Sequence, residues 1–194
     1  MQTTNHQQCR HLTVCAAALF LLVTLAACGG ETSSRSAADE NGPVVPADVP
    51  PTVQQLANAT YTGVFDEPVT LSDGRWEGEP FVEGGASKPS AGLVKDFRLV
   101  GDMDGDGGDE AVVLVWEHSG GTGERLNVAV MDRSGDSIVN LGTDLIGDRV
   151  QIQSGVIFDG QISLSVIQAG PEDAACCPTE KALIGWRLEE GGLT

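Results

Sequence analysis

The segment at residues 101–116 constrains the fold most strongly. It begins Gly-Asp-Met-Asp-Gly-Asp-Gly-Gly-Asp-Glu and continues as the apolar run Ala-Val-Val-Leu-Val-Trp. Asp102, Asp104 and Asp106 alternate, so a tight loop can direct their carboxylates to one point. These anions repel one another unless a cation lies between them, and their oxygens suit a hard cation such as Ca²⁺. Because the apolar run is typical of a buried strand, the segment predicts a cation-binding loop that leads into the core.

The rest of the chain after residue 60 has the pattern of an all-β protein. Short segments rich in β-forming residues alternate with Gly-containing turns at a spacing of roughly 8–12 residues. The expected strands are residues 61–65, 69–71, 75–79, 92–100, 110–116, 126–131, 137–141, 148–154, 162–168 and 182–188. Within residues 92–100, one face is apolar except for Lys95. The pattern predicts a mainly β domain, built as a single antiparallel sheet, a sandwich or a partial barrel.

The first residues have the features of an export signal. Residues 12–27 are almost entirely apolar but shorter than the roughly 20 residues that span a membrane. The stretch ends in Leu-Ala-Ala-Cys, which resembles the lipobox of bacterial lipoproteins. That resemblance implies a signal peptide at residues 1–27, cleavage before Cys28 and a diacylglyceryl group on its sulfur. An ordinary secretory cleavage after Ala27, or a cytosolic chain with an apolar start, are the alternatives.

The next segment is expected to be a spacer. Residues 28–52 are rich in Ser, Ala, Asp and Pro and cannot bury enough apolar surface to fold, which predicts a disordered, lipidated tether. The β-rich extracytoplasmic domain is then residues 53–194. Its first element is a short helical turn capped by Thr52, with Val53 and Leu56 facing inward. Gly29 after the lipidated Cys indicates the periplasmic face of the outer membrane, if the cell has one.

The charge balance limits the partners. The chain has 28 acidic and 11 basic residues, a formal net charge of −17. Such a domain repels nucleic acid and anionic lipid headgroups, so the expected membrane contact is the lipid anchor. Cations, basic envelope proteins and cationic ligands are compatible partners, although the charge can also serve solubility alone.

The Asp-rich loop resembles known calcium loops. It matches the first half of an EF-hand, but the twelfth position, which should carry a bidentate acid, is Val113. The loop is more similar to the nine-position calcium loops of FG-GAP and integrin-type β-hairpins. The ligands that this resemblance implies are the side chains of Asp102, Asp104, Asp106 and Glu110 and the backbone carbonyl of Gly108. A single loop does not predict a propeller of repeats, and an acidic turn that binds no metal is the alternative.

The cysteines offer a second candidate site. Of five cysteines, Cys9 and Cys15 belong to the expected signal peptide and Cys28 to the anchor. Cys176 and Cys177 are adjacent, so in an oxidising compartment they predict either a structural vicinal disulfide or a reactive pair. A redox, thiol or metal-handling role in the envelope is therefore the alternative function.

The sequence predicts a binding protein rather than an enzyme. His118 is the only His after the expected signal, and no catalytic triad follows from the spacing. Four segments are distinctive: the Asp-rich loop, Asn-Ala-Thr-Tyr at 58–61, Leu-Ser-Asp-Gly-Arg-Trp-Glu-Gly at 71–78 and Cys-Cys-Pro at 176–178. Together they resemble a group of uncharacterised bacterial envelope lipoproteins. We therefore expect a lipid-anchored binding or interaction domain with a structural Ca²⁺, whose envelope partner is unknown. An inhibitor or chaperone-like protein for a basic partner is a third possibility.

Overall fold

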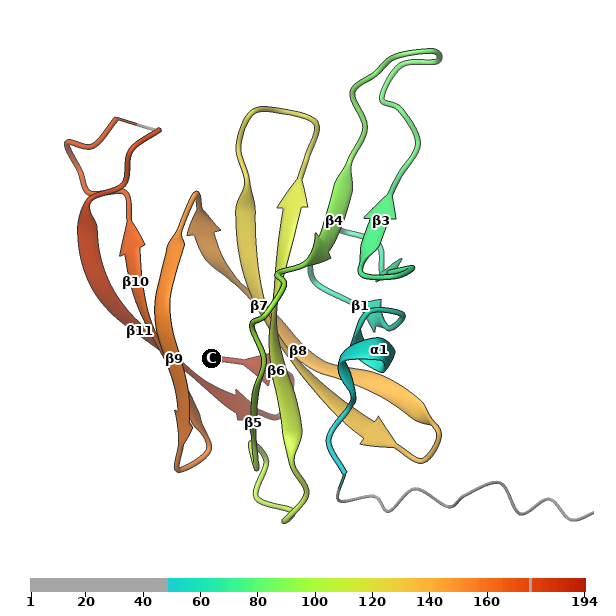
Figure 1. Ribbon diagram of the computed structural model, residues 1–194, viewed down its shortest axis with the longest axis vertical. Helices are drawn as coiled ribbons and strands as arrows, with labels where there is room; N and C mark the ends of the chain where they lie inside the picture. Colours follow the sequence, from blue (N-terminus) through green and yellow to red (C-terminus); the bar gives the residue numbers. More distant parts are fainter. Residues whose placement is uncertain (1–48, 175) are drawn as a thin grey trace, which may run out of the picture. The chain divides into compact units, whose positions relative to one another are not determined.

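The computed structural model describes residues 49–174 and 176–194 (Figure 1). The chain divides into two units, Met1–Glu40 and Asn41–Thr194. The predicted signal peptide, Cys28 and the tether up to residue 48 lie outside the described residues. Within the described residues, no helix has the length and apolar character needed to cross a membrane.

The described chain is mainly β, with a single short helix among the described elements. The helix and strands, in chain order, are α1 (Val53–Leu56), β1 (Thr60–Tyr61), β2 (Val69–Thr70), β3 (Arg75–Glu77), β4 (Ser90–Leu93), β5 (Leu99–Gly101), β6 (Glu110–His118), β7 (Arg125–Ser134), β8 (Ser137–Asp148), β9 (Gln151–Phe158), β10 (Gln161–Gln168), β11 (Glu180–Glu189) and β12 (Gly192–Leu193). This confirms the predicted fold class.

Three antiparallel sheets make up the domain. A six-stranded sheet runs β3-β4-β6-β7-β8, with β5 paired to the same edge of β6 as β4. A four-stranded sheet runs β12-β11-β10-β9, and β1 and β2 form a separate ladder. The architecture is open and sandwich-like rather than a closed barrel. Of the predicted alternatives, the structure therefore fits the sandwich.

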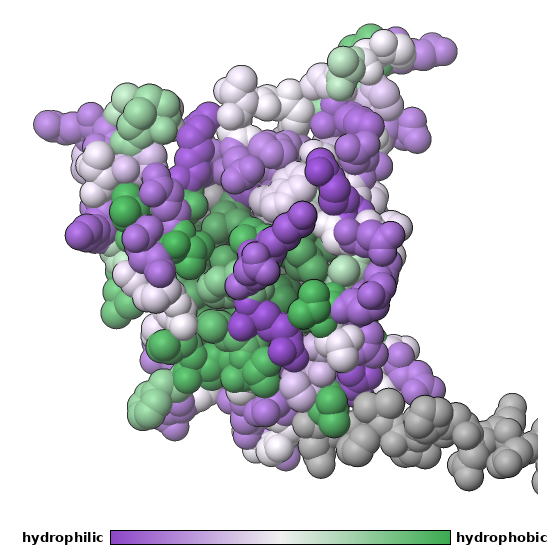
Figure 2. Space-filling view, viewed as in Figure 1, coloured by the Kyte–Doolittle hydropathy of each residue, from purple (hydrophilic) through white to green (hydrophobic). Residues whose placement is uncertain are grey.

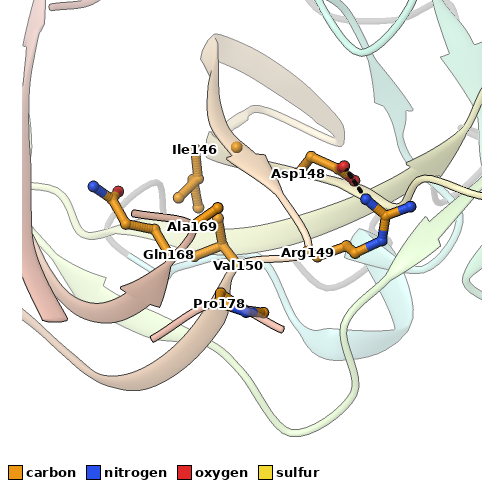
Figure 3. A pocket seen from close by; sticks show the side chains of 8 residues that line it. Ile146, Asp148, Arg149, Val150, Gln168, Ala169 and Pro178 are labelled. Carbon is orange, nitrogen blue, oxygen red and sulfur yellow. Dashed lines mark hydrogen bonds and ion pairs between the residues drawn. The ribbon is translucent and has the colours of Figure 1, made fainter. Parts of the chain in front are cut away.

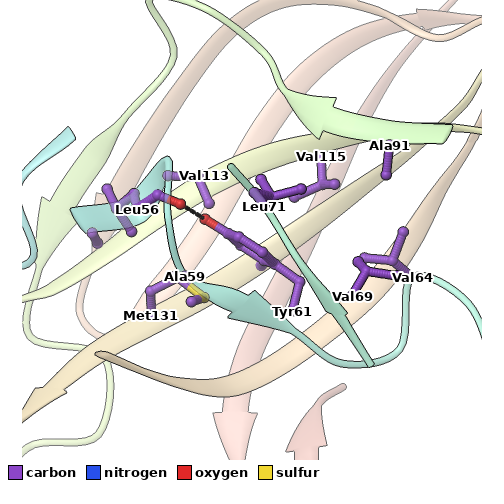
Figure 4. Packing of buried hydrophobic residues seen from close by; sticks show 12 residues of the cluster. Leu56, Ala59, Tyr61, Val64, Val69, Leu71, Ala91, Val113, Val115 and Met131 are labelled. Atoms are coloured by element: carbon purple, nitrogen blue, oxygen red, sulfur yellow. Dashed lines mark hydrogen bonds between the residues drawn. The ribbon is translucent and has the colours of Figure 1, made fainter. Parts of the chain in front are cut away.

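The six-stranded sheet is buried on both faces at its centre. On one face Val113, Val115 and Met131 pack with residues from α1, β1 and β2 (Figure 4). On the other face Leu114 and Val128 pack against the inner side of β9, β10 and β11. Strands β6 and β7 therefore need apolar side chains at successive positions, which explains the continuous apolar run after the Asp-rich loop.

Helix α1 forms as predicted but exposes one expected core residue. The Thr52 hydroxyl oxygen accepts a hydrogen bond from the Gln55 N–H, and the Gln55 side-chain oxygen accepts one from the Thr52 N–H, which completes a capping box. Leu56 is buried, and its carbonyl accepts a bond from the Tyr61 hydroxyl at 2.9 Å (Figure 4). Val53 is 66% exposed, so the prediction that it faces inward was wrong. A helix of one turn covers the sheet with a single position, and Leu56 occupies it.

The predicted strand at residues 92–100 is broken in two. β4 ends at Leu93, opposite Val115, and β5 begins at Leu99, opposite Val112. Five residues thus separate Leu93 from Leu99, whereas two separate their partners on β6. The additional residues turn out of the sheet through Asp96, whose φ is 63°. This turn places Lys95 in solvent, where a continuous strand would direct it to the apolar face.

Other predicted boundaries also shifted. β8 runs to Asp148, well beyond the predicted end at 141, and β9 starts at Gln151 rather than 148. Two irregularities in the pairing of β7 with β8 interrupt the two-residue alternation by which a strand is recognised. The first expected strand ends at Tyr61, because the chain turns at Gly63 with a φ of 76°.

The two large sheets approach each other at both edges. β5 lies against β9, where a Cβ on Gly101 would come 3.0 Å from Ile157 Cγ2. β12 lies against β8, where a Cβ on Gly142 would come 3.0 Å from the Leu193 nitrogen. Glycine at both positions therefore permits the close approach. The contact of β5 with β9 places the Asp-rich loop beside the turn from β9 to β10.

Candidate functional site

The Asp-rich loop joins β5 to β6 and brings three carboxylates together. Asp102, Asp104 and Asp106 each direct one oxygen to a common region, with these oxygens within 4.8 Å of one another. Asp102 is half-buried, and Asp104 and Asp106 are exposed. In the part of the chain that the structure describes, this is the one group of at least three acidic, His or Cys side chains with metal-binding spacing.

Backbone N–H groups hold the loop in this shape. Asp102 accepts hydrogen bonds from the Gly105 nitrogen at 2.6 Å and the Gly107 nitrogen at 3.2 Å. Gly105 and Gly107 have φ values of 82° and 89°, which favour glycine. Asp104 accepts a bond from the Asp106 nitrogen at 3.1 Å. The alternating Asp-Gly sequence thus encodes a tight turn that keeps the carboxylates on one side.

Gly108 lies at the edge of this group, and Glu110 lies outside it. The Gly108 N–H donates to Asp106 Oδ1 at 2.7 Å. Glu110 is 1% exposed, and its Oε2 accepts a hydrogen bond from the Met103 nitrogen at 2.6 Å. The structure therefore brings three of the four predicted side-chain ligands together. Glu110 instead braces the start of the loop from the core side.

Burial makes the Glu110 carboxyl a weaker acid than a solvent-exposed Glu. Desolvation is the largest effect and raises the pKa of Glu110 to about 7. The Met103 N–H opposes this shift by bonding to the carboxylate, whereas the charges of Asp104, Asp132 and Asp106 add to it. Near neutral pH, Glu110 is thus balanced between its neutral and its charged form.

The three aspartates form a donor set for a hard cation. No Lys, Arg or His of the described ranges forms an ion pair with any of them. Ca²⁺ takes six to eight oxygens, so carbonyls and water would complete the shell around these side chains. The geometry suits a divalent cation bound by oxygen, and the choice of Ca²⁺ comes from the sequence resemblance.

A surface hollow adjoins the loop. It has a volume of about 670 Å³ and lies between Asp102 and Asp104, the Phe158–Gly160 turn and the end of β11. Phe158 is 80% exposed, whereas Arg187 donates a hydrogen bond to the Asp159 carbonyl at 3.0 Å. A cation in the loop would therefore face a mixed polar and apolar surface.

The cysteine pair lies in the loop from β10 to β11. The structure joins the exposed Cys176 and Cys177 by a disulfide. Asp173 organises this loop by accepting hydrogen bonds from the Gly170 N–H and from Thr179, and these bonds lower its pKa. Neither Cys belongs to a metal-binding group among the described residues.

A second hollow lies beside the cysteine loop. It has a volume of about 370 Å³, and Ile146, Val150, Gln168 and Pro178 line it together with the Asp148–Arg149 ion pair (Figure 3). Its walls come from β8, the turn before β9, the end of β10 and the cysteine loop. Whether this loop has a redox role stays a prediction.

Sequence analysis missed a buried acid at the other end of β6. Glu117 is 1% exposed, and its Oε1 lies 2.9 Å from Nη1 of Arg125 on β7. That contact lacks hydrogen-bond geometry, and neither carboxylate oxygen has a bonded partner in the described part of the chain. Desolvation raises the pKa of Glu117, and Arg125 opposes the rise. The one indication of this buried acid in the sequence is that Glu117 directly follows the apolar run at residues 111–116.

Sequence analysis also missed a groove at the break between β4 and β5. It has a volume of about 610 Å³, and the side chains of Arg75, Lys95, Arg98 and Trp116 line it. Arg75, the segment with Lys95 and Arg98, and Trp116 are distant from one another in sequence, and sheet pairing brings them together. The one available signal was Lys95, which interrupted an otherwise apolar face.

Comparison with known proteins adds no relative from which a role could be transferred. No protein-family model, curated protein or solved structure matches the chain. The fold and the loop together define an open antiparallel β-sandwich domain with a candidate hard-cation loop at one end. Its function is therefore argued from its own residues.

Proposed function

We propose that the chain is a bacterial lipoprotein anchored in the cell envelope, whose β domain is a binding module with one structural Ca²⁺. The observation that carries the calcium proposal is the convergence of Asp102, Asp104 and Asp106 within 4.8 Å. Three carboxylates at that separation repel one another, and a divalent cation between them removes the repulsion. The ion would stabilise the β5–β6 connection rather than perform chemistry.

The anchor proposal rests on the N-terminal sequence. The lipobox-like Leu-Ala-Ala-Cys at residues 25–28 supports acylation of Cys28. The domain's contacts begin by residue 49, because the Val49 and Pro51 carbonyls accept hydrogen bonds from Arg133 and Arg98. Labelling with palmitate, followed by membrane fractionation, tests the anchor. Cys28→Ser should remove the label and release the protein, and retention of the label would refute it.

Thermal unfolding tests the calcium proposal. In the full chain, saturating Ca²⁺ should raise the melting temperature above its value in EGTA, because a ligand that binds only the folded state stabilises it. Asp104→Asn should abolish this rise, since it removes one of the three converging charges. Mg²⁺ in place of Ca²⁺ measures the selectivity.

Asp109→Asn is the matched control for Asp104→Asn. It makes the same chemical change in the same loop, at an exposed residue outside the three-carboxylate group. The calcium response should survive this substitution. Superimposable melting curves of the unmodified chain in Ca²⁺ and in EGTA would reject the site, and an equal loss in both variants would reject the assigned ligands.

A redox or thiol-handling protein is the alternative from another class. The exposed position of Cys176 and Cys177 makes them accessible to a partner. Thiol titration of the exported protein distinguishes the two functions. Two free, reactive thiols would favour the alternative, and an oxidised, inert pair would favour the binding module.

Capture of a basic envelope protein that is lost at high salt would support the third, charge-driven possibility.

A further inference from the structure

The groove at the break between β4 and β5 has the size of a small-molecule site. Its volume of about 610 Å³ lies within the range of roughly 300–1,000 Å³ that is usual for ligand pockets. One wall is α1 with the turn before β3, and the other is the segment from Leu93 to Arg98. The floor includes Val113 and Trp116 of β6. The groove thus exists because β4 and β5 leave a gap along β6.

The groove concentrates positive charge in a strongly acidic protein. Arg75, Lys95 and Arg98 line it, whereas the chain as a whole has a net charge of −17. Asp73 and Asp96 also line the groove, but neither forms an ion pair with these cations within the described residues. Three cations against two carboxylates leave a local excess of positive charge.

Two of the cations have binding capacity that the described chain does not use. Arg98 donates from Nη2 to the Pro51 carbonyl at 2.8 Å, but its Nε is buried and has no hydrogen-bond partner among the described residues. The Arg75 guanidinium lies 5.3 Å from the centre of the Trp116 ring. Arg75 is exposed, so its remaining N–H groups are available to a ligand. Because the Nε of Arg98 is closed to solvent, Arg98 would reach a ligand through its terminal N–H groups.

The surroundings of these cations are apolar. Phe97 and Trp116 line the groove together with Leu93 and Val94. Figure 2 shows hydrophilic residues over the segment between β4 and β5, and a hydrophobic area beside them that extends toward β9. A ligand that fits must therefore combine acceptor oxygens with an apolar body.

We propose that this groove binds a small anion that carries an aromatic ring. Its carboxylate or phosphate would accept hydrogen bonds from Arg75, Lys95 and Arg98, and its ring would lie along Trp116 and Phe97. Guanidinium groups favour such anions because they present several N–H donors in one plane. The site is separate from the Asp-rich loop, so the proposal holds whether or not the loop binds calcium.

Isothermal titration calorimetry of the full chain in non-ionic detergent tests the proposal. The probes are phenyl phosphate and benzoate, with benzyl alcohol as the neutral probe of similar shape. Both anions should bind more tightly than benzyl alcohol, and the tighter of the two identifies the preferred acceptor group. The titrations are repeated in EGTA and in Ca²⁺, so that failure of the calcium site and failure of the groove are distinguishable.

Substitutions in the groove locate the binding. Arg75→Gln and Lys95→Gln change exposed side chains that make no described hydrogen bond, so both should leave the fold intact. Each should weaken anion binding roughly tenfold, the equivalent of about one charge-assisted hydrogen bond. Lys181→Gln is the matched control, because Lys181 is an exposed cation on β11. Absence of anion binding, equal affinity for benzyl alcohol, or an equal loss in Lys181→Gln would overturn the proposal.

Discussion

Replacing Glu110 by Gln should make the domain more stable at alkaline pH. The Glu110 carboxyl is 1% exposed, and desolvation raises its pKa to about 7. Gln is neutral at every pH, and its side-chain oxygen can still accept the hydrogen bond from the Met103 nitrogen. The substitution therefore removes the cost of ionising a buried acid while it keeps the contact that braces the loop.

The magnitude follows from the difference between the folded and unfolded pKa values. The pKa of Glu110 is about 7 in the folded chain against an ordinary value of 4.5, and each pKa unit corresponds to about 1.4 kcal/mol. The folded state binds the proton more tightly. Protonation of Glu110 therefore stabilises the folded state. This stabilisation is fully present below pH 4.5 and is lost as the pH rises through 7. Glu110 therefore costs the native chain about 3 kcal/mol of unfolding free energy by pH 8, a loss that Glu110→Gln avoids.

Urea denaturation followed by tryptophan fluorescence measures this effect. The quantity to compare is the unfolding free energy of Glu110→Gln minus that of the unmodified chain, in EGTA, between pH 5 and pH 8. It should increase by roughly 2–3 kcal/mol over this range. Calcium should reduce the increase, because an ion beside Asp104 and Asp106 offsets the charges that raise the Glu110 pKa.

Asp109→Asn serves as the control, since it removes one negative charge from an exposed position in the same loop. Its stability difference should stay nearly flat with pH. If the profiles of Glu110→Gln and the unmodified chain run parallel from pH 5 to pH 8, the burial argument fails.

Two further substitutions, with one surface substitution as a control, test the packing of the two cores. Tyr61→Phe removes the buried hydroxyl that donates to the Leu56 carbonyl, so urea denaturation should show a loss of about 1–3 kcal/mol. Retention of full stability would show that this bond is dispensable. Leu164→Ala should cost about 2–5 kcal/mol, because Leu164 is fully buried on the inner side of β10. Leu183→Ala, at a residue that is 77% exposed on β11, should change stability by less than about 0.5 kcal/mol, and equal losses in both would contradict the assignment of faces.

Local patterns made much of the fold predictable. The runs that became β6 and β10 have the composition of buried and half-buried strands, and they formed at nearly the expected residues. The convergence of Asp102, Asp104 and Asp106 is equally local, because alternating Asp and Gly residues determine the turn. Thr52 could be identified as a helix cap for the same reason, since the capping box spans only four positions.

Features that depend on distant residues were not predictable in this way. The inner position of Glu110 arises because β6 is covered on both faces, which a single strand does not reveal. The long β8 contains pairing irregularities that depend on its partner β7. The groove brings together residues from β3, the segment after β4 and β6, so no short motif contains it.

The segment between Leu93 and Leu99 links these observations. It places Lys95 on what would otherwise be the apolar face of one strand, and in the structure the chain turns out of the sheet at Asp96, whose φ is 63°. This turn leaves the gap along β6 that forms the cationic groove, and it restarts the chain as β5 against β9. β5 then leads directly into the three aspartates. The positively charged groove and the negatively charged loop thus lie on either side of β5, separated by only the length of that strand. This separation gives a strongly acidic domain two surfaces of opposite chemistry, one suited to a metal cation and the other to an organic anion.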